Sequence, residues 1–128
     1  MTDKRKKILV ADDEQQLALA ITIRLQSQGY DVVTASDGRQ ALELIAKERP
    51  DLVILDVVMP VMDGYFCLRE INQKFGRGRI PVIILTARDQ MKELFELEGI
   101  EDYVIKPFDH EDLLIRIDRV FKRRVNAG

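Results

Sequence analysis

The 128-residue chain has one cysteine, one histidine and no tryptophan. Because Cys67 has no second cysteine to pair with, an internal disulfide bond is excluded. With His110 as the only imidazole, the sequence has no Cys/His cluster that would bind zinc, and a Ser/His or Cys/His catalytic triad is disfavoured. We expect Cys67 to be a small buried hydrophobic residue and His110 to lie at the start of the last helix.

A large excess of one charge is also missing, since 20 Lys and Arg residues stand against 22 Asp and Glu residues. This balance argues against direct nucleic-acid binding by this chain and against a polybasic membrane anchor. The apolar run after the basic start covers only residues 8–11, which is too short for a signal peptide. No segment approaches the roughly 20 apolar residues of a membrane span. The sequence therefore predicts a cytoplasmic protein that makes no contact with a membrane.

What the sequence does contain is an alternation of short apolar runs with longer segments of helical period. The length suits one domain and is sufficient to bury most of the unfolded surface. Strands are predicted at residues 8–11, 31–35, 52–55, 81–85 and 103–105. Helices are predicted from about residue 17 to the glycine at 29, at 38–48, 65–75 and 91–98, and from about 111 onward. Five successive βα units predict a parallel sheet with helices on both faces.

Polar side chains stand where four of the predicted strands end. They are Asp12 and Asp13 after the first strand, Asp56 after the third, Thr86 after the fourth and Lys106 after the fifth. Taken singly, each has an ordinary structural role, such as a helix N-cap, a loop acid, a hydroxyl bonded to the backbone or a solvated charge. Because open α/β sheets bind ligands at the carboxyl ends of their strands, we expect the five side chains to converge on one site.

Three crowded carboxylates repel one another unless a cation lies between them or their pKa values rise. Oxygen ligands without histidine or thiolate favour Mg²⁺, with Mn²⁺ as an alternative. Such a cation would lower the negative charge around Asp56, while Lys106 and the hydroxyl of Thr86 could hold phosphoryl oxygens. The residues therefore support the hypothesis that an aspartate of this site accepts a phosphoryl group.

Four short motifs carry a resemblance to a known family. They are Asp12-Asp13, Asp56 with Met59-Pro60 and Asp63-Gly64, Thr86-Ala87, and Lys106-Pro107-Phe108. In these motifs the chain resembles the receiver domain of two-component response regulators, in the CheY-like superfamily. The resemblance implies one receiver domain over residues 1–128 with its core at about 7–121, acting as a signalling phosphoacceptor and not as an enzyme. It also implies an α/β, flavodoxin-like (βα)5 fold, doubly wound, with the strand order 2-1-3-4-5.

The resemblance implies a role for each residue of the site. Asp56 would be the phosphoacceptor that attacks the phosphohistidine of a sensor histidine kinase or phosphotransfer protein. Asp13 and Asp56 would bind Mg²⁺ directly, and Asp12 would bind it through water. The backbone carbonyl of Val58 would be a further metal ligand, and Lys106 would pair with the phosphoryl group.

A conformational switch is implied by the resemblance as well. Thr86 would move to bond a phosphoryl oxygen, and Tyr103 would swing inward into the space that Thr86 leaves. The face made by the fourth helix, the fifth strand and the fifth helix would then change and act on an output domain or a target protein. Pro60 and Gly64 would shape the loop after the acceptor, and Pro107 would follow a cis peptide bond.

Two features leave alternatives open. The segment between Thr86 and Lys106 is a couple of residues shorter than is usual in the family, so we expect the helix at 91–98 to be short, displaced or partly unwound. Tyr103 could instead be a core aromatic residue with a solvated hydroxyl. The sequence also leaves open whether this is a stand-alone protein or the receiver of a longer regulator.

Other functional classes fit the residues less well. A flavin or nucleotide enzyme on the same fold would need a Gly/Ser/Thr-rich phosphate loop after the first strand, where this chain has Asp-Asp-Glu. A hydrolase of the haloacid dehalogenase type would need a second acid two positions after its nucleophile, where Val58 stands. A receiver that only binds partners would lack part of the phosphorylation site, whereas none of those residues is missing.

Overall fold

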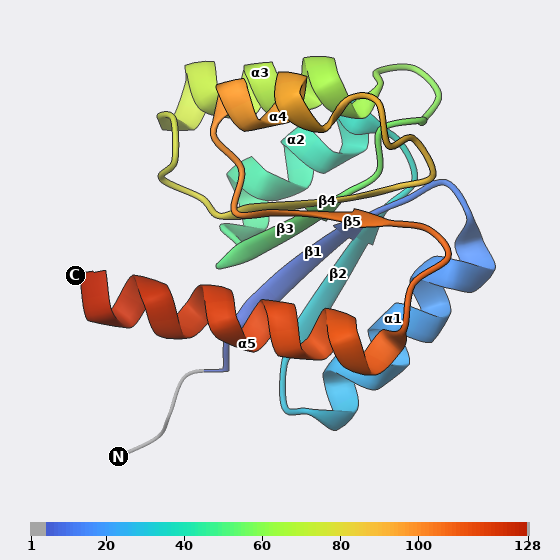
Figure 1. The fold of residues 1–128 in the computed structure, drawn as a ribbon, viewed down its shortest axis with the longest axis vertical. Helices are drawn as coiled ribbons and strands as arrows, with labels where there is room; N and C mark the ends of the chain where they lie inside the picture. Colours follow the sequence, from blue (N-terminus) through green and yellow to red (C-terminus); the bar gives the residue numbers. More distant parts are fainter. Residues whose placement is uncertain (1–4, 128) are drawn as a thin grey trace.

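Residues 5–127 are described by the computed structural model, in which strands and helices alternate along the chain (Figure 1). The strands are β1 (Lys7–Ala11), β2 (Asp31–Ala35), β3 (Leu52–Leu55), β4 (Val82–Thr86) and β5 (Asp102–Ile105). The helices are α1 (Gln15–Ser27), α2 (Gly38–Glu48), α3 (Gly64–Phe75), α4 (Lys92–Glu98) and α5 (His110–Ala127). Each predicted strand and helix is present, with its ends shifted by no more than one or two residues. The predictions that concern residues 1–4 and 128 lie outside the described residues.

The strands form one parallel sheet in the order β2-β1-β3-β4-β5. Helices α1 and α5 cover one face of the sheet, and α2, α3 and α4 cover the other (Figure 1). This is the flavodoxin-like α/β fold, with the strand order 2-1-3-4-5, that the family resemblance implies. The strand order reverses between β1 and β3, so the carboxyl ends of these two neighbours border the crevice where such folds bind ligands.

The central strands are buried on both faces. Leu9 of β1 and Val53 of β3 pack beneath α2 and α3, whereas their neighbours Val10 and Ile54 pack beneath α1 and α5. All four side chains are almost fully removed from solvent. Burial on both sides of the sheet explains why these strands are continuous apolar runs instead of alternating patterns.

Helix α4 is only seven residues long, in agreement with the expectation of a short helix in this region. Phe95 is its one buried side chain. The carbonyl of Leu97 accepts a hydrogen bond from Arg77 Nη2, and that of Glu98 accepts one from Asn72 Nδ2, both at 2.7 Å. Side chains from α3 and the segment that follows it therefore hold the carboxyl end of α4 in place.

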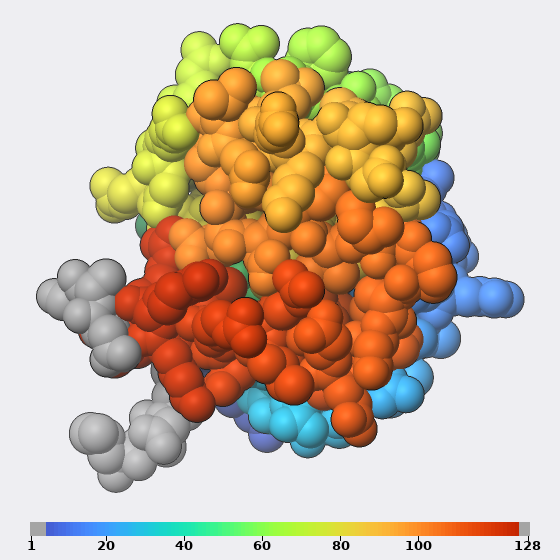
Figure 2. Space-filling view, in the orientation of Figure 1, coloured from blue at the N-terminus to red at the C-terminus, as the bar shows by residue number. Residues whose placement is uncertain are grey.

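Helix α5 is the longest helix and packs one apolar stripe against the sheet. Leu113, Ile117 and Val120 are buried, at the spacing of one helix face. Figure 2 shows α5 side by side with the α4 and β5 segments on one face of the molecule. Within residues 5–127, no helix combines the length and the apolar character needed to cross a membrane.

Candidate functional site

The carboxyl ends of four strands bring the predicted site residues together. Asp12 and Asp13 follow β1, Asp56 follows β3, Thr86 ends β4, and Lys106 follows β5. One carboxylate oxygen from each of the three aspartates lies within 4.8 Å of the others. Asp12 and Asp56 are buried, whereas Asp13 is exposed. The tertiary structure thus forms the acidic cluster that the sequence predicts.

The loop between β3 and α3 passes close to the backbone of Asp56. The amide of Asp56 donates to the carbonyl of Ala11 at 2.9 Å, which joins the ends of β3 and β1. A Cβ atom on Gly64 would lie 2.2 Å from the carbonyl oxygen of Asp56, and the Gly64 amide donates to the carbonyl of Val57 at 2.7 Å. Only glycine fits at this approach, which supports the predicted role of Gly64 in shaping the loop. Pro60 lies in the same loop and is exposed.

Lys106 is shared by three carboxylates. Its Nζ atom lies 2.8 Å from Asp12 Oδ2, 2.9 Å from Glu14 Oε1 and 3.3 Å from Asp56 Oδ2. Burial by itself would lower the pKa of Lys106, but hydrogen bonds to Asp12 and Glu14 and the charge of Asp56 outweigh it and raise the pKa above its ordinary value. Lys106 is therefore a permanent cation at this site. The peptide bond that joins it to Pro107 is cis, as the resemblance implies.

Asp56 has a raised pKa, first because it is buried and second because Asp12 carries a negative charge beside it. The charge and hydrogen bond of Lys106, and a hydrogen bond from the amide of Val58 to Asp56 Oδ1 at 3.4 Å, act in the opposite direction. The ionised carboxylate of Asp56 is therefore costly in this pocket. Additional positive charge among the three aspartates would favour its ionised form.

Asp12 uses its two carboxylate oxygens for different partners. Oδ2 accepts from Lys106, and Oδ1 accepts from the backbone amide of Glu14 at 2.9 Å. The amide of Asp12 donates to the carbonyl of Ala35 at the end of β2. Helix α1 has Glu14 and not Asp12 at its N-cap position. The role of helix N-cap, which was one ordinary explanation for Asp12, is therefore wrong.

Thr86 and Tyr103 are joined through the backbone of Arg88. The Thr86 hydroxyl accepts from the Arg88 amide at 3.3 Å, and the Tyr103 hydroxyl donates to the Arg88 carbonyl. Thr86 is fully buried, and the Tyr103 ring packs against Phe95 with 6.0 Å between ring centroids. Tyr103 is thus a core aromatic residue whose hydroxyl is bonded to protein and not solvated. Its burial, together with the charge of Asp89, raises the pKa of Tyr103.

Three features of the site were not predicted from the sequence. Glu14 contacts Lys106, the backbone of Arg88 links Thr86 to Tyr103, and a Cβ atom on Gly38 would lie 2.3 Å from the carbonyl oxygen of Met62. The only available signal for Glu14 was its position directly after the two aspartates. Backbone contacts such as that of Arg88 leave no mark on residue type, so the sequence contains no signal for them.

The two remaining candidates for polar chemistry lie outside the site. Cys67 is fully buried, and burial raises the pKa of its thiol to about 12, which confirms its prediction as a hydrophobic core residue. His110 is the first residue of α5, with its ring 4.9 Å from that of Phe108. The amide of Glu111 donates to the side chain of Asp109, so Asp109 and not His110 satisfies the start of this helix.

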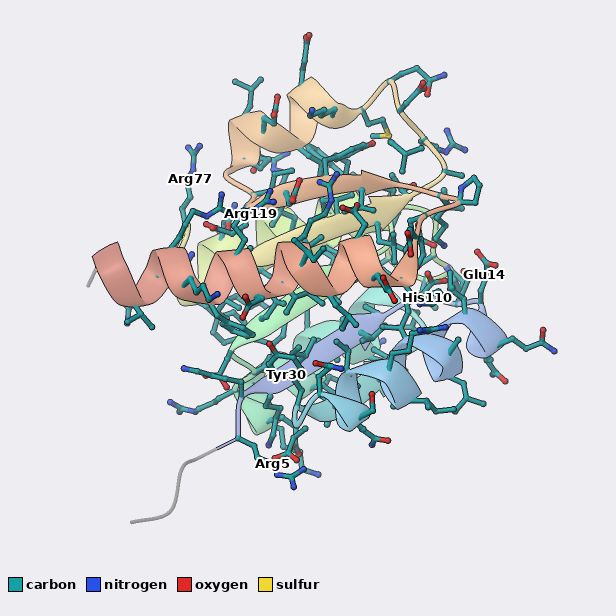
Figure 3. The ribbon with its side chains drawn as sticks, turned by 60° about the horizontal axis from the view of Figure 1, so that its bottom comes forward. Arg5, Glu14, Tyr30, Arg77, His110 and Arg119 are labelled. Atoms are coloured by element: carbon teal, nitrogen blue, oxygen red, sulfur yellow. The ribbon has the colours of Figure 1, made fainter. Side chains whose placement is uncertain are left out.

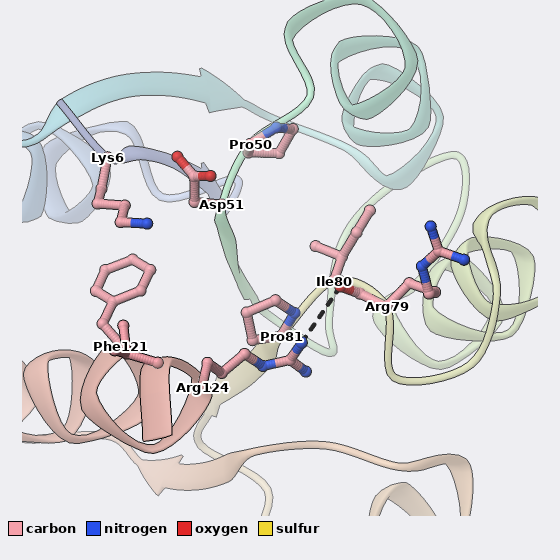
Figure 4. A pocket seen from close by; sticks show the side chains of 9 residues that line it. Lys6, Pro50, Asp51, Arg79, Ile80, Pro81, Phe121 and Arg124 are labelled. Carbon is pink, nitrogen blue, oxygen red and sulfur yellow. Dashed lines mark hydrogen bonds between the residues drawn. The ribbon is translucent and has the colours of Figure 1, made fainter. Parts of the chain in front are cut away.

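A hollow of about 290 Å³ lies at the opposite edge of the sheet (Figure 4). It is lined by Lys6, Asp51, Pro81, Phe121 and Arg124, among others, and Arg124 Nη1 donates to the carbonyl of Arg79 at 3.3 Å. These residues lie at the amino ends of β1, β3 and β4 and at the carboxyl end of α5. The hollow is therefore remote from the carboxylate cluster and takes no part in its chemistry.

Comparison with known proteins places the site in a family context. Residues 8–118 match the family model described as "Response regulator receiver domain". A curated relative, "Probable transcriptional regulator ycf27" of Galdieria sulphuraria, is 46% identical over 122 residues, which cover 94% of this chain and 47% of that protein. The chain spans about half the length of the curated relatives it matches.

Solved structures of response regulator proteins also superpose on this chain. The receiver domain of the Francisella response regulator 1452 superposes with a TM-score of 0.84 at 35% sequence identity, over 94% of this chain and 99% of that chain. A CheX-CheY-BeF3-Mg²⁺ complex from Borrelia burgdorferi contains a chain that is 29% identical, with a TM-score of 0.84 over 91% of this chain and 89% of that chain.

Proposed function

The chain belongs to the response regulator receiver domain family, and we propose that Asp56 is the residue on which it accepts a phosphoryl group. As a receiver domain, the chain is a signalling phosphoacceptor and not a catalytic enzyme. The observation that carries the proposal is the convergence of charge on Asp56, which is buried, belongs to the three-aspartate cluster and lies 3.3 Å from the ammonium of Lys106.

The donor in this proposal is the phosphohistidine of a sensor histidine kinase or of a phosphotransfer protein. A carboxylate oxygen of Asp56 attacks the phosphorus atom, the P–N bond breaks, and the imidazole leaves with the bonding electron pair. Lys106 then pairs with a phosphoryl oxygen, and the hydroxyl of Thr86 donates to another. Both side chains come from strands on the same side of β3, so they can meet the group as it forms on Asp56.

We propose Mg²⁺ as the cation of the cluster, with Mn²⁺ as an alternative. Asp13 and Asp56 would bind it directly, Asp12 through water, and Val58 through its backbone carbonyl. The donor set consists of oxygen atoms only, which suits a hard cation, and three carboxylates so close together repel one another without one. Bound there, the cation would offset the negative charge that Asp56 and an incoming phosphoryl group bring together.

The conformational response is proposed to run from Thr86 to Tyr103 and on to the face formed by α4, β5 and α5. The Arg88 backbone, which bonds to both side chains, supports this route. That face exposes the large hydrophobic side chains of Leu94, Leu97, Ile105 and Ile115. An output domain or a target protein would be the partner that senses the change.

The remaining proposals concern the domain and its setting. We propose that residues 1–128 form a single receiver domain with its core at about 7–121, within the cytoplasm. Because the curated relatives are about twice as long and are described as transcriptional regulators, an output domain beyond this stretch of sequence is one proposed arrangement. The receiver itself would bind neither nucleic acid nor membrane, in keeping with its net charge of −2.

Intact mass after incubation with acetyl phosphate and Mg²⁺ tests the role of Asp56. We expect the wild-type protein to gain one phosphoryl group and Asp56→Asn to gain none. Asp118→Asn is the matched control, because Asp118 lies on the exposed side of α5 and its one ion-pair partner within residues 5–127 is Lys122. This variant should gain the group as the wild type does. An equal gain in Asp56→Asn would refute the proposal.

A further inference from the structure

The side chain of Glu14 has no role in the proposed function, yet it contacts Lys106, the cation of the site. Figure 3 shows Glu14 at the amino-terminal end of α1, on the side of the molecule where α5 begins at His110. Its Oε1 atom lies 2.9 Å from Lys106 Nζ, although the Glu14 side chain is 61% exposed. Most exposed acids of this protein that form ion pairs do so with partners that are themselves well exposed, whereas Lys106 is only 12% exposed.

Helix capping does not account for Glu14. It occupies the N-cap position of α1, but its side chain makes no hydrogen bond to the first turn. In α2 and α3, by contrast, the N-caps Asp37 and Asp63 accept from the amides of Gln40 and Phe66. The Glu14 amide is bonded to Asp12 instead. The contact with Lys106 is therefore the interaction that this carboxylate makes.

The geometry at Lys106 leaves no spare donor. An ammonium group has three N–H bonds, and the three carboxylates of Asp12, Glu14 and Asp56 use them. Asp56 is the most distant of the three, at 3.3 Å. A phosphoryl group on Asp56 can take over only the Asp56 share, which is the longest of the three contacts. A closer approach of Lys106 to the phosphoryl oxygens therefore requires Asp12 or Glu14 to release its own short contact. Glu14 is the exposed member of the three and lies outside the proposed metal ligands, so its contact is the one that is released at least cost.

We propose that Glu14 is a positioning residue that draws the ammonium of Lys106 away from Asp56 and competes with the phosphoryl group for it. This inference rests on the proposed roles of Asp56 and Lys106. The Glu14–Lys106 contact therefore stabilises the unmodified protein relative to the phosphorylated protein, in which this contact is broken. Removal of the Glu14 carboxylate is therefore expected to strengthen the hold of the site on a phosphoryl group.

Binding of beryllofluoride, a phosphoryl mimic, at saturating Mg²⁺ tests this competition without phosphodonor kinetics. We expect Glu14→Gln to bind BeF₃⁻ about two- to fivefold more tightly than the wild type, the range expected for loss of one partly exposed ion pair. Isothermal titration calorimetry gives the dissociation constants. Glu43→Gln is the matched control, because it removes the same charge from an exposed site on α2, and its affinity should equal that of the wild type.

A second variant separates position from charge. Glu14→Asp keeps the negative charge but shortens the side chain by one methylene group, so its carboxylate no longer reaches Lys106 from the same backbone position. We expect Glu14→Asp to bind BeF₃⁻ as tightly as Glu14→Gln. The ¹⁵N resonance of Lys106 Nζ, followed before BeF₃⁻ is added, should move in both variants and stay unchanged in Glu43→Gln.

Two results would overturn the inference. Equal BeF₃⁻ affinities of the wild type and Glu14→Gln would mean that Glu14 does not compete for Lys106. A wild-type affinity in Glu14→Asp would mean that only the charge matters. Failure of the proposed function has a different signature. The wild type would then bind no BeF₃⁻, or Asp56→Asn would bind it as tightly as the wild type, and the inference would fall with the proposed function.

Discussion

At the scale of single residues, the site is defined by an excess of negative over positive charge. Asp12, Asp13, Glu14 and Asp56 lie around one cation, Lys106. Lys106 lowers the pKa of Asp56, but burial and the charge of Asp12 raise it by more. The ionised carboxylate of Asp56 is therefore energetically unfavourable in the folded protein, although the proposed chemistry needs it as the nucleophile.

Asp56→Asn is expected to raise the free energy of unfolding at pH 7 in EDTA by about 1 kcal/mol, a common size for a single-site change. The pKa of Asp56 is raised in the folded protein. Protonated Asp56 therefore stabilises the fold fully below its unfolded pKa of about 3.9, and this stabilisation is lost as the pH rises through the folded pKa. Because asparagine does not ionise, the Asp56→Asn variant does not lose this stability as the pH rises. Urea unfolding between pH 4 and 8 measures the effect, and the gain should shrink toward pH 4.

Asp118→Asn provides the comparison, since Asp118 is exposed and forms a helix-surface ion pair with Lys122. Its stability should change by a few tenths of a kcal/mol with no such dependence on pH. A loss of stability in Asp56→Asn at pH 7 would mean that the attraction between Asp56 and Lys106 exceeds the cost of burial and repulsion.

At the scale of elements, the loop between β4 and α4 is joined to two strands by hydrogen bonds. Helix α4 is short and buries only Phe95. The Arg88 carbonyl accepts a hydrogen bond from the Tyr103 hydroxyl of β5, and the Arg88 amide donates one to the Thr86 hydroxyl at the end of β4. Two strands and the loop are thus joined at one residue, which gives the loop a defined position beside the acidic cluster.

Tyr103→Phe is expected to lower the free energy of unfolding by about 1 kcal/mol, because the Arg88 carbonyl loses its hydrogen-bond donor while the ring packing is kept. Amide hydrogen exchange in residues 87–91 should become faster. Tyr30→Phe is the control, because the Tyr30 ring packs against Phe121 and its hydroxyl has no hydrogen-bond partner within the described part of the chain. Unchanged exchange in Tyr103→Phe would contradict a role of this hydroxyl in holding the loop.

At the scale of the whole molecule, the two edges of the sheet have different characters. The carboxyl edge carries the acidic cluster, whereas the opposite edge carries the hollow lined by Lys6, Arg79 and Arg124. Arg124 bonds to the carbonyls of Gly78 and Arg79 and to Glu101, so cations at that edge tie α5 to the loop before β4. The charges that tie the elements together and the charges of the acidic cluster thereby lie at opposite edges of the sheet.

Mg²⁺ is expected to stabilise the whole fold, since the folded protein gathers three carboxylates that the unfolded chain disperses. At one hundred times its Kd, the free energy of unfolding should rise by about 2.7 kcal/mol. Asp13→Asn should abolish most of this gain at little cost to the fold, because Asp13 is exposed. Urea unfolding with Mg²⁺ and with EDTA measures both, with Glu43→Gln retaining the full gain. An equal gain in Asp13→Asn would exclude Asp13 as a ligand.

Much of the fold was predictable because its signals are local and repeated. Continuous apolar runs such as residues 52–55 indicated buried parallel strands, and polar residues at the ends of four of the five strands indicated the site. Gly64 was predictable from a motif. Gly38 was not, because the atom that leaves no room for a side chain there is the carbonyl oxygen of Met62, which lies on a loop far away in the sequence.

The sequence by itself determined the class of fold, the order of elements and the residue types that meet at the carboxyl edge, because period and strand ends are properties of the chain alone. Only the tertiary structure decided how the charges are shared. The division of Lys106 among Asp12, Glu14 and Asp56, and the bonds of Thr86 and Tyr103 to Arg88, depend on distances between residues far apart in the chain. Hydrogen bonds and pKa shifts change over fractions of an ångström and with burial, so these long-range contacts and the shifts that they cause arise only when the chain has folded.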